Sequence, residues 1–152
     1  MKIAMDSELI FLYERMLNPY DRQRTPEPNL RYSVNDKNAF DIIDALEKIY
    51  KSGAIFCKLP INQEVLKENP KADNKLSECC LSEIEFHKIN QRVNELTDAY
   101  DDLLDECRLL EEAEQCSVNI ILTRNGNFID NLHSKADGVR ILYPVVYSNE
   151  IK

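Results

Sequence analysis

Short apolar runs alternate along the chain with longer amphipathic segments. The runs at residues 3–5, 54–59 ("AIFCKL") and 117–122 ("SVNIIL") are nearly continuous, as expected for strands that are buried on both faces. The segments that follow space their apolar residues three and four apart, which predicts helices. This succession predicts an α/β fold in which helices cover both faces of a mainly parallel central sheet.

Capping residues and prolines predict where several helices begin and end. Asp6–Ser7 precedes the amphipathic stretch "ELIFLYERML", and Asp36 is the expected N-cap of "DKNAFDIIDALEKIYKSG", with Gly53 past its end. Pro60 is expected to close the second strand. Pro70 is expected to end a short helix in "NQEVLKEN".

Residues 71–116 predict a long helical segment between the second and third strands. No glycine or proline occurs from Lys71 to Asn125. The apolar residues form a heptad seam of more than three repeats, which predicts one long helix, two collinear helices broken near Thr97–Asp98, or a helical hairpin. The seam consists of Phe86, Ile89, Val93, Leu96, Tyr100, Leu103, Cys107 and Leu110.

The third predicted strand runs directly into the polar stretch Thr123–Arg124–Asn125. Asn125–Gly126 is a strong hairpin signal, but "NFIDNLHSKADGV" after it lacks the alternation of a returning strand. A short helix or turn is expected there, followed by a final strand in "VRILYPVVY" that is interrupted at Pro144. The polar stretch and Asp6 therefore both fall at the carboxyl ends of strands, where ligands bind in parallel sheets.

The length of 152 residues predicts a single domain spanning residues 1–152. Residues 18–34 contain three of the six prolines together with Arg22, Arg24 and Arg31, and are expected to form a loop outside the core. No apolar stretch has the ~18 residues needed for a membrane span, and none at the start is long enough for a signal peptide. A cytoplasmic protein without membrane contact is therefore expected.

The cysteines predict reduced and mostly buried thiols. They are odd in number, lack a C-x-x-C spacing and lie in periodic apolar segments, unlike a disulfide framework. His87 and His133 are isolated from any pair of cysteines, so a zinc site is not indicated. The five cysteines are Cys57, Cys79, Cys80, Cys107 and Cys116.

The net charge of −8 comes almost entirely from the central part of the chain. Residues 61–116 carry fifteen acidic side chains and six basic ones. An acidic chain argues against non-specific nucleic-acid binding through a broad basic face. It remains compatible with a nuclease in which acidic side chains hold metal ions that contact phosphates.

Acidic side chains occur where a metal site for phosphodiester hydrolysis would need them, because magnesium and manganese prefer oxygen ligands. On a helix, Asp101, Asp105 and Glu112 fall within about 40° of one another, with Asp98 one turn earlier. A solvated acidic face opposite the heptad seam would give the same pattern. Asp6 could equally be only an N-cap.

The order of these acids resembles that of the PIN domains, a family of metal-dependent ribonucleases. The matching pieces are "IAMDSELIFLY", "LPINQEVLKE" and "DECRLLEEAEQCSVNIILTRNGNF". The resemblance implies a three-layer α/β/α sandwich in which Asp6, Glu68 and Asp105 are the catalytic carboxylates that bind magnesium or manganese. Glu64 is the alternative to Glu68, since a shift of one turn in a short helix exchanges them.

The resemblance also assigns roles around these acids. Ser7 would support Asp6, and Thr123 would hold the loop beside Asn125. Asn125 stands where the family often has a fourth acid, so it would offer a carbonyl oxygen to the metal or its water. Glu8 departs from the usual smaller residue. RNA is the implied substrate, and the residues expected to contact it are Arg124, Thr123, Ser7, Arg22, Arg24 and Arg31.

A second function class is a catalytically inactive domain that binds proteins. The heptad seam could pair two copies into a homodimer, although packing within the domain is its commoner fate. The acidic face could also recruit a basic partner. Many members of the resembled family are toxins held by a small antitoxin, which would be another protein partner.

Overall fold

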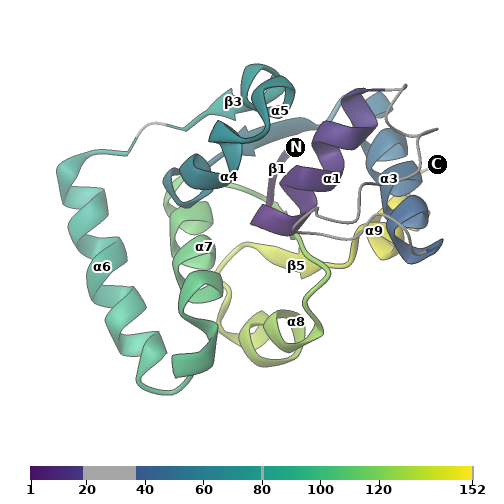
Figure 1. Ribbon diagram of the computed structural model, residues 1–152. Helices are drawn as coiled ribbons and strands as arrows, with labels where there is room; N and C mark the ends of the chain where they lie inside the picture. Colours follow the sequence, from purple (N-terminus) through teal and green to yellow (C-terminus); the bar gives the residue numbers. More distant parts are fainter. Residues whose placement is uncertain (19–36, 80, 152) are drawn as a thin grey trace.

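The computed structural model describes residues 1–18, 37–79 and 81–151, and places a five-stranded parallel sheet between two layers of helices (Figure 1). The strand order is β3-β2-β1-β4-β5. The α/β class and the parallel sheet are confirmed, and the arrangement is compatible with a three-layer sandwich. The strands are β1 (Lys2–Met5), β2 (Ile55–Lys58), β3 (Ser77–Glu78), β4 (Ile120–Leu122) and β5 (Arg140–Leu142).

The helices divide between the two faces of the sheet. On one face α1, α3 and α9 pack with the short helices α4 and α5; on the other face lie α7 and α8, with α6 packed against α7 (Figure 1). The α-helices are α1 (Ser7–Leu17), α3 (Lys37–Lys51), α4 (Gln63–Lys67), α5 (Pro70–Lys75), α6 (Glu83–Thr97), α7 (Leu104–Gln115), α8 (Gly126–Leu132) and α9 (Pro144–Glu150). The 3₁₀ turns are η1 (Pro60–Asn62), η2 (Asp101–Leu103) and η3 (His133–Lys135).

Alternation along the strands supplies both halves of the core. In β1, Ile3 and Met5 face the α1 and α3 layer, whereas Ala4 between them faces α7 and α8. In β4, Ile120 and Ile121 face opposite layers in the same way. Because both faces are covered, every residue of β4 is buried, which explains the continuous apolar run in the sequence.

Two prolines begin helices where the sequence suggested an end or an interruption. Pro70 is the first residue of α5, and Pro144 is the first residue of α9, so the final strand stops at Leu142. Proline is favoured at the first helical position because its missing N–H would have no partner there. The end of α3 follows the prediction, since Gly53 adopts a φ of +89° just beyond it. Asp36 lies outside the described residues, as do Arg22, Arg24 and Arg31.

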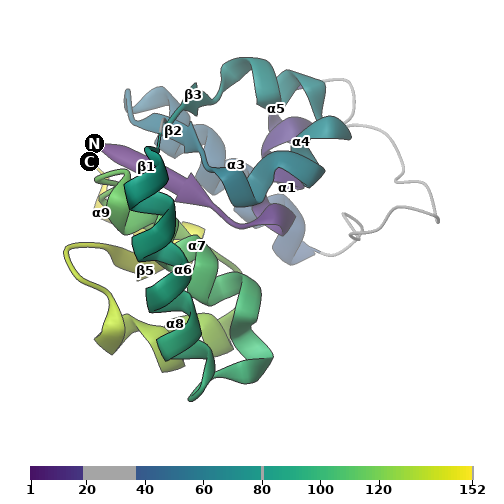
Figure 2. The ribbon, with the colours of Figure 1, turned by 90° about the vertical axis from the view of Figure 1, so that its left-hand side faces the viewer.

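The long helical segment is an antiparallel hairpin, not a continuous helix or a collinear pair (Figure 2). Helix α6 ends at Thr97, where the N–H groups of Ala99 and Tyr100 both bond to the Leu96 carbonyl. The chain turns through η2 and returns as α7. Of the seam residues on α6, Ile89, Val93 and Leu96 are buried within the chain itself and Phe86 is half-buried. No described helix has the length and apolar character needed to cross a membrane.

Two adjacent glutamates on α7 are buried, which corrects the prediction that Glu112 belongs to a solvated or metal-binding face. Glu112 accepts a hydrogen bond from the Ile61 N–H at 2.8 Å and forms an ion pair with Arg108. Burial, followed by the negative charge of Glu114, raises the pKa of Glu111 to about 7. Through its hydrogen bond from the Ile61 N–H, Glu112 ties η1 to α7.

The cysteines also correct the sequence prediction, because Cys79 and Cys116 form a disulfide. Cys79 precedes α6 and Cys116 follows α7, so the bond closes the base of the hairpin. Cys57 and Cys107 are buried free thiols, as expected, and Cys80 lies outside the described residues.

Removing this disulfide is expected to destabilise the protein. Cys116→Ala should lower the free energy of unfolding by roughly 2–4 kcal/mol, because the bond closes a loop of 37 residues in the unfolded chain. Chemical denaturation without reductant measures the change. Reductant should destabilise the wild type but leave Cys116→Ala unaffected. Alkylation of both Cys79 and Cys116 in the unfolded, unreduced protein would contradict the disulfide.

Candidate functional site: an acidic hollow at the carboxyl ends of the strands

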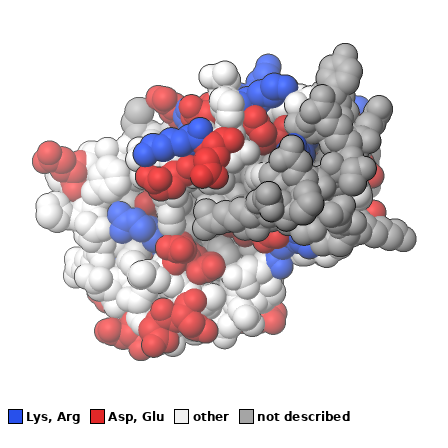
Figure 3. All heavy atoms as spheres, viewed as in Figure 1, with Lys and Arg blue, Asp and Glu red and all other residues white. Residues whose placement is uncertain are grey.

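A hollow of about 440 Å³ lies at the carboxyl ends of β1 and β4. Five carboxylates from the α1, α4 and α7 regions line it, and we refer to it as the acidic hollow. In the space-filling view, acidic side chains with basic ones between them cover the part of this face that carries α4 and α7 (Figure 3). The lining residues are Asp6, Ser7, Glu8, Ile61, Asn62, Glu64, Val65, Asp105, Glu106, Leu109 and Asn125.

Asp6 is both the N-cap of α1 and a member of the site. Its Oδ1 accepts a hydrogen bond from the Leu9 N–H at 3.0 Å, and its Oδ2 accepts one from the Thr123 hydroxyl. The two interpretations of Asp6 are therefore compatible. Strand register places Asp6 beside Thr123, because Met5 lies opposite Leu122 and the Asp6 N–H bonds to the Leu122 carbonyl.

The surroundings of Asp6 favour its protonated form. Burial raises the pKa of Asp6 to about 6, and the negative charges of Glu8 and Glu106 contribute to the rise. The hydrogen bonds from Thr123 and Leu9 oppose it without cancelling it. Asp6 is thus a carboxyl group that changes its protonation near neutral pH, as catalytic carboxyl groups often do.

Asn125 turns its amide nitrogen toward the acids. Its Oδ1 accepts hydrogen bonds from the N–H groups of Asn127 and Phe128 and so caps α8. Its Nδ2 donates to Glu106 Oε1 at 3.2 Å. The side-chain oxygen of Asn125, expected to face a metal or its water, is thus engaged in capping the start of α8. The Asn125–Gly126 pair, a hairpin signal in the sequence, therefore marks the start of α8.

Glu64 lines the acidic hollow, whereas Glu68 is exposed at the end of α4 and is absent from its lining. This geometry favours Glu64 as the acid from α4. Glu64 also forms an ion pair with Lys67 at 3.1 Å. Arg124 forms an ion pair with Glu8 at 3.0 Å, so at least part of the Arg124 charge is directed at a carboxylate of the hollow.

Helix α7 contributes two acids, Asp105 and Glu106, from its first turn. The turn at residues 98–103 points this end of the helix at the sheet edge, and Asp98 and Asp101 stay outside the hollow lining. Sequence reasoning identified Asp105 but missed Glu106. Their adjacency in the first turn of a helix was the available signal.

Sequence reasoning also missed Asn62, which is buried beneath the hollow. Its Nδ2 donates to the Met5 carbonyl at 3.2 Å, and its Oδ1 accepts the Leu59 N–H. These bonds join η1 to the carboxyl end of β1. A buried asparagine in the short "LPIN" turn gave no chemical signal by itself.

The donor set fits a hard cation in its chemistry, because carboxylate oxygens are the ligands that magnesium and manganese prefer. Burial, with a smaller contribution from the negative charges of Glu8 and Glu106, raises the pKa of Asp6, and a bound cation would favour the charged form instead. Across residues 1–18, 37–79 and 81–151, no three His, Cys, Asp or Glu side chains converge as a ready-made ion site. Several of the acids are instead engaged by Arg124, Lys67 and Asn125.

The fold and this hollow define an α/β protein with an acidic site at the carboxyl edge of a parallel sheet. No family model, curated protein or solved structure matches the chain.

The raised pKa of Asp6 predicts a pH-dependent stability. The folded protein holds a proton on Asp6 up to a pH of about 6, whereas an unfolded aspartate releases it near 3.8. The folded state thus binds more protons in this window, and the free energy of unfolding should fall as the pH rises through it. Asp6→Asn should remove this component and gain stability over the wild type on the order of 1–2 kcal/mol at pH 7.5.

Urea unfolding in chelator at pH 4 and 7.5 measures the difference. Thr123→Val is the matched variant: it removes a hydrogen bond that lowers the pKa of Asp6, so the fall in stability should extend to higher pH. The same pH dependence in the wild type and Asp6→Asn would contradict the assignment.

Proposed function

We propose that the protein is a magnesium- or manganese-dependent ribonuclease that hydrolyses phosphodiester bonds at the acidic hollow. The observation that carries the proposal is the gathering of five carboxylates from three regions of the chain at the carboxyl edge of a parallel sheet. Ligands bind at this edge in open α/β sheets. RNA as the substrate follows from the resemblance to PIN domains.

Asp6, Asp105 and Glu106 are the side chains proposed to hold the metal, with Glu64 completing the set. When bound, the ion supplies an acidified water and neutralises charge on the scissile phosphate. Because the pKa of Asp6 is raised to about 6 in the protein itself, binding of the ion would favour loss of the proton from its carboxyl group.

The neighbouring polar residues position these acids. The Thr123 hydroxyl holds Asp6 Oδ2, and its Oγ1 also accepts the Asn125 N–H at 3.0 Å. Asn125 in turn holds Glu106 through its side-chain amide. The polar stretch after β4 therefore orients one acid from α1 and one from α7, on opposite walls of the hollow.

The alternative of a protein-interaction module has less support from the geometry. The seam residues on α6 that would form a dimer are largely covered within the chain: Ile89, Val93 and Leu96 are buried, and Phe86 is half-buried. A homodimer or an antitoxin-like partner would need another surface.

Charge-removing substitutions at the hollow are expected to abolish cleavage. Asp6→Asn, Asp105→Asn and Glu106→Gln should each lower kcat by at least about 100-fold in magnesium or manganese, because each removes a charge that would hold the ion. Asp98→Asn is the matched control, since Asp98 is exposed and outside the hollow. Glu64→Gln should reduce the rate more than Glu68→Gln. Cleavage that survives all three hollow substitutions, or that persists in chelator, would refute the proposal.

Metal binding can be measured without activity. Manganese should raise the melting temperature of the wild type at pH 7.5, because a ligand of the folded state stabilises it. Asp98→Asn should respond like the wild type. The response of Asp6→Asn should be much smaller. Equal shifts in all three proteins would place the ion elsewhere.

A further inference from the structure

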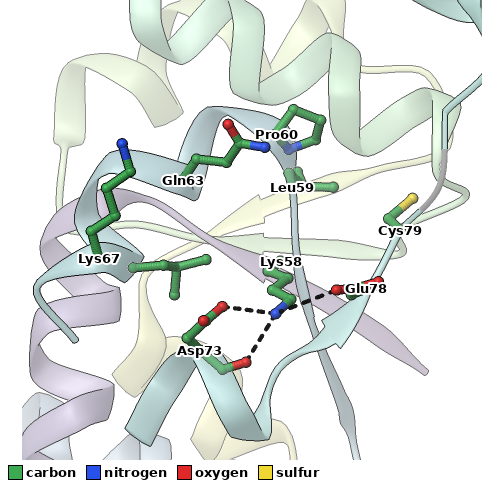
Figure 4. A pocket seen from close by; sticks show the side chains of 9 residues that line it. Lys58, Leu59, Pro60, Gln63, Lys67, Asp73, Glu78 and Cys79 are labelled. Atoms are coloured by element: carbon green, nitrogen blue, oxygen red, sulfur yellow. Dashed lines mark hydrogen bonds and ion pairs between the residues drawn. The ribbon is translucent and has the colours of Figure 1, made fainter. Parts of the chain in front are cut away.

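A second hollow, of about 500 Å³, lies beside the carboxyl ends of β2 and β3 (Figure 4). Two of its lining residues are lysines, and we refer to it as the lysine hollow. The lining residues are Lys58, Leu59, Pro60, Gln63, Leu66, Lys67, Asp73, Glu78 and Cys79.

The two hollows lie on opposite sides of one short segment, residues 60–67. Ile61, Asn62, Glu64 and Val65 line the acidic hollow, whereas Pro60, Gln63, Leu66 and Lys67 line the lysine hollow. The exposed ion pair between Glu64 and Lys67 links the two sets. A polymer that occupies the acidic hollow has only to cross α4 to reach the lysine hollow.

Lys58 is a held ammonium group at the end of β2. Its Nζ donates to Asp73 Oδ1 at 2.7 Å and to the Asp73 carbonyl at 3.0 Å, and its side chain is 20% exposed (Figure 4). Glu78 lies 3.8 Å away, within ion-pair range but beyond a hydrogen bond. Since an ammonium group has three N–H donors, one is left over after these bonds within the described part of the chain.

The remaining lining residues offer different chemistry. Leu59, Pro60 and Leu66 form an apolar wall, and the Gln63 amide both donates and accepts hydrogen bonds. Lys67 is an exposed cation on the side nearest the acidic hollow. The Asp73 and Glu78 carboxylates also line the hollow, and each lysine is paired with an acid. The apolar area, the amide and the N–H donors that the two ammonium groups retain suit a nucleotide, which combines a flat base with a phosphate. Among the described residues that line the two hollows, the basic ones are Lys58 and Lys67.

From this arrangement we infer that the lysine hollow is a substrate subsite that binds a nucleotide of a single-stranded RNA next to the bond cleaved at the acidic hollow. Lys67 and Lys58 contact its phosphate, and Gln63 with the apolar wall receives its base. The inference rests on the proposed function, but binding can be tested separately from cleavage.

The test measures the affinity of a fluorescent single-stranded RNA of about ten nucleotides in chelator, where no metal-dependent cleavage occurs. Lys67→Gln should weaken binding about three- to tenfold at low salt and reduce the salt slope by about 0.7, as for one lost phosphate contact. Gln63→Ala should weaken binding without changing the salt slope. Lys88→Gln, at an exposed position on α6, is the control and should bind like the wild type.

In the cleavage assay, Lys67→Gln and Gln63→Ala should raise KM with little change in kcat, which separates this subsite from the acidic hollow. Unchanged affinity in both variants would overturn the subsite. Weakened binding without cleavage in the wild type would overturn the nuclease while supporting an RNA-binding role for the lysine hollow. Equal weakening by Lys88→Gln would indicate a general charge effect and would also overturn the inference.

Discussion

The pairing of β1 with β4 is the constraint on which the candidate site depends. Because Met5 lies opposite Leu122, the next residues along each strand, Asp6 and Thr123, emerge side by side at the sheet edge. Any other register would separate the carboxyl from the hydroxyl that orients it. A shift by one residue would also exchange which β4 side chains face each layer, so core packing and site assembly favour the same register.

The segment 60–67 is the second element that the site needs, and polar contacts hold it together with the buried side chains of Val65 and Leu66. Asn62 donates a hydrogen bond to the carboxyl end of β1, and the buried Glu112 on α7 accepts a hydrogen bond from the Ile61 N–H. These contacts fix a short ridge between the acidic hollow and the lysine hollow. Burying a carboxylate costs free energy unless it is hydrogen-bonded or paired. The burial of Glu112 therefore favours the position of segment 60–67 in which the Ile61 N–H reaches it.

The α6–α7 hairpin shows how local pattern and tertiary structure diverge. A heptad seam has the same appearance whether it pairs with another chain, continues as one helix or folds back on itself. Here the break at residues 98–103 lets Val93 and its neighbours pack within the chain, and it points Asp105 and Glu106 toward β1. The Cys79–Cys116 disulfide joins residues 37 positions apart at the hairpin base. Cysteine spacing cannot show that proximity.

The sequence by itself determined the elements whose signals are local. Buried runs predicted β1, β2 and β4, Asp6 predicted the start of α1, and Gly53 predicted the end of α3, because burial period, capping and backbone conformation act over a few residues. Only the tertiary structure decided that Glu64 rather than Glu68 lines the hollow, that Glu106 joins it, and that Asn125 directs its oxygen to a helix and its nitrogen to an acid. Those outcomes depend on which distant segments meet. Since contacts between such segments are set by packing of the whole chain, no local pattern contains them.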